Sequence, residues 1–404
     1  MKKFEEVAMN ENNPKWENSI KRVEEMYDPI YGIEQVKTMR TEFDRDYTRT
    51  INCNAYKRLK HKTQVFFAPK NDHICTRIEH VNLVESISHT IASYLGLNTD
   101  LTKAIAVAHD IGHSPFGHQG ETILSAISER EYNEKFWHAK NGLHFVDDLE
   151  LLKDYGGIKK NLNLTYAVRD GIIAHSGEPD KNGLKPRNEV VDFKDFNFSG
   201  KYNPYTWEGC VVKIADNISY MGRDIEDAIQ MNLLTERDVE KFDKVIEKVK
   251  INNSNIINYL VVDLCENSTI EGGLKFSSEA LETMYQIRKF NMEKIYKHDK
   301  IKPTIRYFTV LINELFYALR NEYDGKNTIK NLKKMERYYP VLANEFIGWL
   351  SNYAITECRD EKSYNNKIIY NIENLQDYNR AIVDYMSGMT DIYIVKIYNE
   401  LVNY

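Results

Sequence analysis

Cysteine is scarce in this sequence, and the few cysteines are scattered. Of the 404 residues only five are cysteines, and no C-x-x-C pair occurs. They stand far apart along the chain, at Cys53, Cys75, Cys210, Cys265 and Cys358. An odd number of widely spaced cysteines argues against a disulfide framework and against a zinc knuckle. The sequence therefore predicts a protein of a reducing compartment.

Long apolar runs and an excess of charge of one sign are also missing. No segment approaches the roughly 20 apolar residues that a membrane-spanning helix needs, and the N-terminal stretch lacks the apolar part of a signal peptide. The 54 basic and 60 acidic residues leave a net charge of -6, which does not draw the chain to nucleic acid or to an anionic membrane. We expect a cytoplasmic protein with no membrane partner and no obligatory nucleic-acid partner.

Prolines are few as well, and three of the nine fall within residues 176–206. We expect that stretch to be irregular, with a short hairpin as the alternative. Elsewhere helical periodicity prevails, because apolar residues recur every three or four positions in segments such as 81–95. A strand-like run at 63–67 is isolated. The predicted fold class is all-α.

Histidine is the residue that the chain concentrates in one part. Nine of the 11 histidines precede residue 145. They are His61, His73, His80, His89, His109, His113, His118, His138 and His144. Histidines with only structural roles should scatter along the chain, so this crowding indicates a functional site.

Four residues form a candidate metal-ligand set: His80, the adjacent pair His109 and Asp110, and the distant Asp216. Two imidazoles and two carboxylates suit a hard or borderline divalent cation that keeps positions for water and a phosphate oxygen. Neighbouring residues diverge by about 100° on a helix, so the adjacent pair can serve one ion only where a helix ends. Gly112 is the expected stop of that helix.

The helix before the pair is expected to begin at Thr99 or Asp100 as its N-cap. Residues 112–118, GHSPFGH, contain two glycines and a proline and are predicted to be a turn between two helices. The alternative for the His-Asp pair is a capped helix end with a surface histidine. The apolar run just before the pair favours a site at the edge of the core.

Four segments, in this order, resemble one known family: NDHICTRIEHVNLVE, LTKAIAVAHDIGHSPFGHQGE, GIIAHSGE and ADNISYMGRDIEDAI. The sequence is similar to the HD-domain deoxynucleoside triphosphate triphosphohydrolases, the dGTPase-like enzymes. The resemblance runs from about Asp44 to about Asp227 and is weaker afterwards. It implies an HD-domain helical bundle with additional C-terminal helices, a bound divalent metal, and cleavage of a dNTP into deoxynucleoside and intact triphosphate.

The resemblance assigns the metal ligands to His80, His109, Asp110 and Asp216. A metal held there would lower the pKa of bound water and polarise the α-phosphate. The alternative for any one of these positions is an ordinary polar residue at the start or end of a helix.

The catalytic residues that the resemblance implies are His113, His118, Glu121 and His138. The first three would lie beside the α-phosphate, and His138 would protonate the departing 5′-oxygen, because an alkoxide is a poor leaving group. Ala139 and Asn141 stand where the family pattern has an amide and a glutamine. The alternative for His138 is a histidine packed among neighbouring aromatic residues.

The substrate-binding residues that the resemblance implies are Gln64, Arg77, Tyr220 and Asp224. Arg77 would bind phosphate as a guanidinium fork, with a surface arginine as the alternative. Tyr220 would pack on the sugar and exclude a 2′-hydroxyl, while Asp224 and Gln64 would bind the 3′-hydroxyl. A core tyrosine and a solvated aspartate are the alternatives for the helix positions.

Two other positions in these segments carry weaker expectations. Asn217 stands where some relatives carry lysine, so we expect one phosphate contact fewer. For His175 a satisfied core histidine is the favoured interpretation.

The predicted function is therefore a metal-dependent dNTP triphosphohydrolase, with dGTP as the leading substrate. The alternatives are another HD phosphohydrolase, acting on a nucleoside monophosphate, a cyclic nucleotide or an alarmone, and a nucleotide-sensing oligomeric module. The metal is open among Mn, Mg, Fe, Co, Ni and Zn. By resemblance we expect a homo-oligomer, a hexamer or tetramer, and leave open a dNTP activator.

The expected organisation is an N-terminal arm at 1–48, an HD core at 49–235 and a C-terminal helical region at 236–404, packed as one structural unit. The tract at 281–300 is basic and aromatic. We interpret it as a solvated helix face with a packed stripe, and leave open that it reaches a neighbouring subunit's site or a phosphate.

Overall fold

The computed structural model describes residues 2–24, 40–67, 71–154, 156–177, 182–246 and 248–403. Within these residues the all-α class is confirmed, since the one sheet is a two-stranded antiparallel hairpin of β1 (Leu151–Lys153) and β2 (Lys159–Asn161). Every helix in these parts of the chain is too short or too polar to cross a lipid bilayer.

The chain forms two compact units, each built from separate stretches of sequence. Unit 1 comprises Met1–Ile51, Lys70–Asp110 and Asn163–Lys302, and unit 2 comprises Asn52–Pro69, Ile111–Leu162 and Pro303–Tyr404. The division into arm, core and C-terminal region that the sequence suggests stays a prediction.

The helices of unit 1 are α1 (Trp16–Ser19), α3 (Glu42–Asn52), α5 (Arg77–Leu95), α6 (Thr99–Ala108), α9 (Tyr166–Ala174), α10 (Trp207–Gln230), α11 (Glu236–Ile246), α12 (Asn253–Asn267) and α13 (Ser278–Asn291). Short 3-10 helices add Glu5–Val7, Phe193–Asp195 and Asp299–Ile301, and α13 continues into a π-helical turn, Met292–Tyr296.

The helices of unit 2 are α4 (Asn54–Arg58), α7 (Gly117–Tyr132), α8 (His138–His144), α14 (Lys302–Arg320), α15 (Thr328–Met335), α16 (Pro340–Leu350), α17 (Leu375–Ser387) and α18 (Asp391–Val402). Short 3-10 helices add Leu59–His61, Gly325–Asn327 and Glu361–Ser363, and α8 continues into a π-helical turn, Phe145–Leu149.

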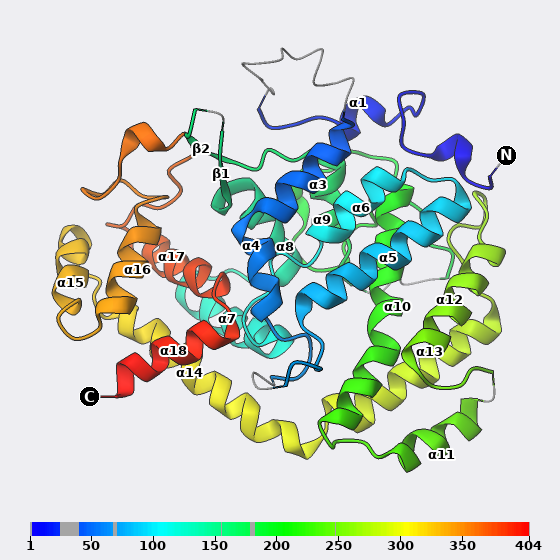
Figure 1. Ribbon diagram of the computed structural model, residues 1–404. Helices are drawn as coiled ribbons and strands as arrows, with labels where there is room; N and C mark the ends of the chain where they lie inside the picture. The colour runs from blue at the N-terminus through cyan, green and yellow to red at the C-terminus, as the bar shows by residue number, and fades with distance from the viewer. Residues whose placement is uncertain are drawn as a thin grey trace. The chain divides into compact units, whose positions relative to one another are not determined.

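Helices α5, α6 and α10 lie side by side and form the part of unit 1 that carries the candidate metal ligands (Figure 1). The predicted helix at 81–95 is part of α5, which begins at a capping box in which the Thr76 backbone N–H donates to Glu79 Oε2 at 2.7 Å. It ends at Gly96, whose φ of 90° lies in the left-handed region. These caps place His80 in the first turn of a helix with a fully buried apolar face.

The prediction of the cap before the His-Asp pair was wrong by one residue. Asn98, and neither Thr99 nor Asp100, caps α6, because its Oδ1 accepts from the backbone N–H groups of Asp100 and Leu101 at 3.0 Å each. The helix also ends earlier than predicted, because α6 ends at Ala108 and residues 109–112 form a turn that reaches the predicted stop at Gly112.

Two stretches that the sequence singles out are largely irregular. The strand-like run at 63–67 is not part of a β-strand. In the excursion at 176–206, residues 178–181 lie outside the described residues. The described part contains one 3-10 helix, and Leu184 pairs with Leu274 in an isolated antiparallel bridge. Arg187 anchors this part by an ion pair with Asp170, which is 1% exposed.

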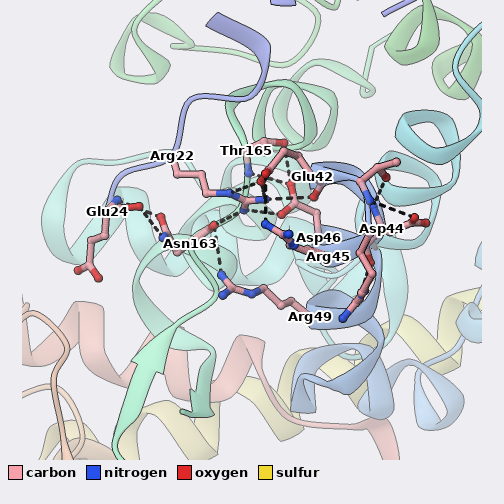
Figure 2. A network of polar contacts seen from close by, with 11 residues as sticks. Arg22, Glu24, Glu42, Asp44, Arg45, Asp46, Arg49, Asn163 and Thr165 are labelled. Atoms are coloured by element: carbon pink, nitrogen blue, oxygen red, sulfur yellow. Dashed lines mark hydrogen bonds and ion pairs between the residues drawn. The ribbon is translucent and has the colours of Figure 1, made fainter. Parts of the chain in front are cut away.

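A buried polar cluster centred on Asp46, the Asp46 network, joins three parts of unit 1 (Figure 2). Arg22 Nη1 lies 2.5 Å from Asp46 Oδ1, and Arg22 Nη2 lies 2.9 Å from Glu42 Oε2. Asp46 Oδ2 accepts from the backbone N–H and the hydroxyl of Thr165 at 2.8 and 2.6 Å. The network ties the N-terminal segment and α3 to the residue that precedes α9.

Asp46 is fully buried, so its charge depends on these partners. Burial raises the pKa of Asp46 from its ordinary value, although the charge of Arg22 and the bonds to Thr165 act in the opposite direction. A buried carboxylate and guanidinium of this kind contribute mainly by satisfying one another. Loss of Arg22 would leave Asp46 without this counter-charge, whereas loss of Asp46 would leave Arg22 its ion pair with Glu42.

We predict that Asp46→Ala destabilises the protein by on the order of 3 kcal/mol, because it removes one of the two carboxylates that pair with Arg22 and the buried acceptor of Thr165. Thermal and urea unfolding at neutral pH measure the change. Asp44→Ala on the same helix is the matched control, since Asp44 only caps the exposed Thr41 turn, and its expected cost is below about 1 kcal/mol. Superimposable unfolding curves for the Asp46 variant and the unmodified protein would contradict the prediction.

Candidate active site

The four predicted metal ligands come together in unit 1 from three neighbouring helices. His80 lies on α5, Asp216 lies on α10, and His109 and Asp110 follow directly after α6. His80 Nε2 is 3.1 Å from Asp216 Oδ1 and 3.6 Å from Asp110 Oδ2. His109 Nε2 is 3.6 Å from Asp110 Oδ1 and 3.9 Å from Asp216 Oδ1. The helix end after Ala108 lets two adjacent side chains face one point, as the sequence predicts.

Hydrogen bonds at the far side of each ring fix how the two imidazoles face this point. His109 Nδ1 lies 2.7 Å from the carbonyl oxygen of Ala106, so Nδ1 carries the proton that it donates. His80 Nδ1 lies 3.2 Å from Ser219 Oγ, whose own hydroxyl donates to the Asp216 carbonyl, so Nδ1 is again the donor. Both rings therefore present Nε2 to the carboxylates, and Nε2 is the nitrogen that can bind a metal when Nδ1 carries the proton.

The donors and their burial fit a divalent cation. His80, His109 and Asp110 offer ligand atoms that all lie within 4.8 Å of one another. Nε2 of the fully buried His109 has no hydrogen-bond partner among the described residues, which is costly for a buried polar atom unless something binds it. Two imidazole nitrogens and two carboxylates are a mixed donor set that transition metals, zinc and magnesium all accept.

The protonation state of Asp216 agrees with this arrangement. Burial by itself raises the pKa of Asp216, but the hydrogen bond and charge of His80, together with His109, lower it well below its usual range. A proton on His80 Nε2 and a bound cation would occupy the same place between His80 and Asp216. We therefore expect proton and cation to compete at this cluster.

Arg77 is neither a surface arginine nor turned toward bulk solvent. It is 1% exposed, and its Nη1 lies 2.6 Å from Asp110 Oδ2. The Arg77 guanidinium therefore orients the carboxylate that is predicted to bind the metal. The phosphate contact that the family resemblance implies for Arg77 stays a prediction.

His175, at the C-terminal end of α9, packs against the metal cluster. Its ring meets that of His109 edge to face, with centroids 5.0 Å apart, and its Nδ1 lies 2.7 Å from the Ile172 carbonyl oxygen. The favoured interpretation of a buried histidine with a backbone partner agrees with this geometry. The contact also restricts the rotation of the His109 ring.

The predicted catalytic residues His113, His118, Glu121 and His138 form a second cluster, in unit 2. Glu121 on α7 lies between two imidazoles, with Oε2 at 3.0 Å from His118 Nδ1 and at 3.1 Å from His138 Nδ1. The rings of His113 and His138 are stacked, with centroids 4.1 Å apart and planes inclined by 13°. Burial raises the pKa of Glu121, but the charges and hydrogen bonds of these histidines lower it far more.

Glu121 also determines where α8 begins. Its Oε1 accepts from the backbone N–H of His138 at 2.9 Å, which satisfies one of the free donors at the start of α8. One carboxylate thus fixes both the backbone and the ring of His138. The His118 side chain is 70% exposed, whereas those of Glu121 and His138 are 15% and 14% exposed.

The turn after Asp110 reaches α8 because residue 112 is a glycine. A Cβ at Gly112 would lie 2.0 Å from the Gly142 nitrogen and 2.3 Å from the His138 carbonyl oxygen. Asn141 Nδ2 donates to the Gly112 carbonyl oxygen at 2.7 Å. The residue that departs from the family pattern at position 141 therefore holds this turn in place, and we expect Gly112 to tolerate no side chain.

Gln64, the predicted 3′-hydroxyl partner, directly follows Lys62 and Thr63, which are both held by hydrogen bonds within unit 2. Lys62 Nζ donates to the carbonyl oxygens of His113 and of Ser387, the latter at 2.8 Å. The backbone N–H groups of Thr63 and of Phe116 donate to the two oxygens of Asp391, both at 2.8 Å. Gln64 is therefore held near the His113 turn within unit 2.

Two of the predicted sugar contacts, Tyr220 and Asp224, lie on α10, C-terminal to the candidate ligand Asp216. Tyr220 donates from its hydroxyl to Asn217 Oδ1 at 3.2 Å, and Arg288 Nη2 donates to the same oxygen at 3.0 Å. Arg288 belongs to the 281–300 tract, whose role the sequence left open. A guanidinium thus lies beside the position at which some relatives carry lysine.

Asp224 is not the solvated aspartate of the alternative interpretation. It is 1% exposed and accepts from the hydroxyl of Tyr296, which lies in the π-helical turn after α13. Its other oxygen, Oδ1, has no hydrogen-bond partner among the described residues. Arg288 and Tyr296 are candidate site residues that sequence reasoning missed, and the basic and aromatic composition of 281–300 was the available signal.

Comparisons with known proteins agree with this geometry. The sequence pattern of the HD domain family matches residues 77–221, the stretch that holds all four candidate ligands. A deoxyguanosinetriphosphate triphosphohydrolase-like protein of Caldanaerobacter subterraneus is 34% identical over 363 residues, covering 90% of this chain and 85% of the relative.

Two further relatives carry the same name. The one of Clostridium tetani is 33% identical over 78% of this chain and 84% of its own, and the one of Wolinella succinogenes is 30% identical over 90% and 95%. The helical fold and the histidine and aspartate cluster define a phosphohydrolase of the HD-domain class. Within that class, the chain belongs to the deoxyguanosinetriphosphate triphosphohydrolase-like family.

We predict that Asp224→Asn becomes progressively more stabilising as the pH rises from 5 to 8. Burial, with a smaller contribution from Asp227, raises the pKa of Asp224 to about 7, while the bond from Tyr296 acts in the opposite direction. The folded protein then keeps a proton that the unfolded chain, with its ordinary value of 3.8, has lost. The stability due to this group is complete below pH 3.8 and is lost as the pH rises through 7.

Thermal unfolding of both proteins in a metal chelator measures this effect. The gap in Tm is expected to be small at pH 4.5 and largest above pH 7. A gap that does not vary with pH would show that Asp224 titrates normally in the folded protein.

Proposed function

We propose that the protein is a metal-dependent dNTP triphosphohydrolase that converts a dNTP, with dGTP as the leading substrate, into deoxynucleoside and inorganic triphosphate. The observation that carries this proposal is the cluster of His80, His109, Asp110 and Asp216 in a chain of this family. Within it, the buried Nε2 of His109 has no hydrogen-bond partner among the residues that the structure describes.

In the proposed reaction, water attacks the α-phosphorus and the bond from phosphorus to the 5′-oxygen breaks. A divalent cation held by the four ligands would supply Lewis-acid activation of the water and of the α-phosphate. Arg77 holds Asp110 in its ligand position, and Ser219 and the Ala106 carbonyl hold the two imidazole rings. This support determines how accurately the ligands are placed.

His138 is the proposed proton donor to the departing 5′-oxygen. Glu121 keeps the Nδ1 side of the ring occupied, and its negative charge favours the protonated imidazole that a general acid needs. The more exposed His118 shares the same carboxylate and is the proposed partner for a phosphate oxygen, with His113 supporting the His138 ring by stacking.

Tyr220, Asp224 and Gln64 are the proposed determinants of sugar recognition. A tyrosine ring against C2′ leaves no room for a 2′-hydroxyl. Asp224 Oδ1, which has no hydrogen-bond partner in the described part of the chain, suits a 3′-hydroxyl donor. Arg288 and Tyr220 both donate to Asn217 Oδ1. Arg288 is the cation that we expect to supply the phosphate contact at the position where some relatives carry lysine.

Product analysis with the metal-loaded protein and each of the four dNTPs and four NTPs tests the proposal. Inorganic triphosphate supports it, whereas phosphate or pyrophosphate would indicate another HD phosphohydrolase, and binding without turnover a sensing module. The homo-oligomer, the dNTP activator and the cytoplasmic location that the sequence suggested stay predictions.

We predict that Asp110→Ala lowers kcat by on the order of 10³-fold or more, because the loss of one ligand removes several kcal/mol of stabilisation by the cation. Steady-state assays under saturating Mn²⁺ measure kcat, and metal binding is measured in parallel by calorimetry. Asp72→Ala is the control, since Asp72 is exposed and lies in the turn before α5. Undiminished turnover in the metal-loaded Asp110 variant would refute the ligand assignment.

We predict that Tyr220→Ala lowers the preference for dNTP over NTP by about tenfold to a hundredfold, because it opens space at C2′. The ratio of kcat/KM for dGTP and GTP measures the preference. Tyr285→Ala is the control, since Tyr285 lies on α13 and is 62% exposed. An unchanged ratio in the Tyr220 variant would remove the steric argument.

A further inference from the structure

Glu121 in unit 2 holds two histidine nitrogens at separations close to those between ligands of one metal ion. Its Oε2 is 3.0 Å from His118 Nδ1 and 3.1 Å from His138 Nδ1. Ligand atoms bound at about 2.0–2.1 Å to a tetrahedral ion lie roughly 3.3 Å apart. The ligand atoms of these three side chains all lie within 4.8 Å of one another, so one ion can reach all of them in place of the hydrogen-bonding protons.

The three side chains come from the starts of two helices. His118 and Glu121 are three residues apart at the start of α7, so they project from the same side of that helix. His138 is the first residue of α8, and its backbone N–H donates to Glu121 Oε1 at 2.9 Å. Stacking on the buried His113, with centroids 4.1 Å apart, keeps the His138 ring in its plane. Glu121 and His138 are therefore in place before an ion arrives.

The cluster is accessible from solvent through one of its members. The His118 side chain is 70% exposed, whereas those of Glu121 and His138 are 15% and 14% exposed. An ion can therefore enter beside His118 without a rearrangement of the backbone. Three protein ligands also leave a coordination position for water, as in zinc sites that remain open.

The donor set indicates which ion this cluster prefers. Two imidazoles and one carboxylate are a set that protein zinc sites use, with water as the fourth ligand. The metal cluster of unit 1 (His80, His109, Asp110 and Asp216) has a second carboxylate in addition to two imidazoles. Magnesium and manganese prefer oxygen donors, whereas zinc binds imidazole nitrogen readily. The cluster in unit 2 therefore favours zinc over manganese and magnesium.

We propose that His118, Glu121 and His138 form a second metal site, which binds zinc. The proposal concerns binding by residues of unit 2 alone, so it does not depend on the proposed hydrolysis. One consequence does rest on the proposed function. Zinc on His138 Nδ1 displaces a proton from the ring, which is then no longer the imidazolium that the proposed proton donation needs, so zinc at this site inhibits turnover.

Equilibrium dialysis of the metal-free, full-length protein against buffered micromolar Zn²⁺, followed by elemental analysis, tests the proposal. We expect two zinc ions per chain in the unmodified protein, one at each cluster. Glu121→Gln and His118→Ala should each retain one zinc ion. The dissociation constant of the other ion should rise at least about hundredfold, because a lost ligand costs no less than a lost supporting hydrogen bond.

Matched variants control for the fold and for unspecific binding. Glu129→Gln changes an exposed glutamate of the same helix, and His61→Ala changes an exposed histidine of unit 2, so both should retain two zinc ions. Glu121→Gln keeps an oxygen that can accept from the His138 backbone N–H. His118→Ala changes a side chain that is mostly exposed, so its thermal unfolding should match that of the unmodified protein.

Asp110→Ala separates this proposal from the ligand assignment in unit 1, because it should lose the ion of unit 1 and retain that of unit 2. A single zinc ion in the unmodified protein that Glu121→Gln loses and Asp110→Ala retains supports the second site and counts against the first. Two zinc ions in both Glu121→Gln and His118→Ala would overturn the proposal. A single ion that only Asp110→Ala loses would overturn it as well.

Zinc inhibition of dGTP turnover, measured in excess Mn²⁺, tests the consequence. The zinc concentration that halves kcat should equal the dissociation constant from dialysis of the Mn²⁺-loaded protein. In His118→Ala both values should rise by the same factor, whatever the remaining activity of that variant. Inhibition with the same midpoint in His118→Ala would trace the effect to the metal cluster of unit 1 and would remove the inhibitory role of the second site.

Discussion

The orientation of two buried imidazole rings is the constraint on which the candidate metal centre depends. The carbonyl oxygen of Ala106 accepts a hydrogen bond from His109 Nδ1, and the hydroxyl oxygen of Ser219 accepts one from His80 Nδ1. Both rings therefore face the carboxylates with Nε2. Without these two acceptors either ring could rotate by 180°, and its Nε2 would no longer face the carboxylates. The packing of α5, α6 and α10 brings the four side chains together around one point.

Glu121 plays a comparable part in unit 2, because a single carboxylate satisfies a helix start and two histidines. The carboxylate that accepts from the backbone N–H of His138 is the same one that contacts Nδ1 of its ring. Structure and proposed chemistry are thereby coupled, since loss of Glu121 would disturb both. Gly112 contributes through the absence of a side chain, which allows the turn to approach α8.

The two histidine-containing clusters differ in how their charges are balanced. In the metal cluster two carboxylates face two imidazoles and one guanidinium, and Nε2 of His109 has no hydrogen-bond partner among the described residues. In the cluster of unit 2 a single carboxylate, that of Glu121, is shared by two imidazoles. The first arrangement suits a bound cation, and the second suits the proton transfer that we propose.

The sequence by itself determined the all-α class, through helical periodicity, and the family with its four candidate metal ligands, through the motifs that carry the resemblance. Only the tertiary structure decided that Arg77 pairs with Asp110, that Asp224 is buried against Tyr296 and that Arg288 reaches Asn217. These contacts join helices whose separation in sequence carries no signal of their neighbourhood. The burial of each ionisable group and the identity of its partner determine its charge. Both arise from packing between such helices, and no local sequence pattern encodes them.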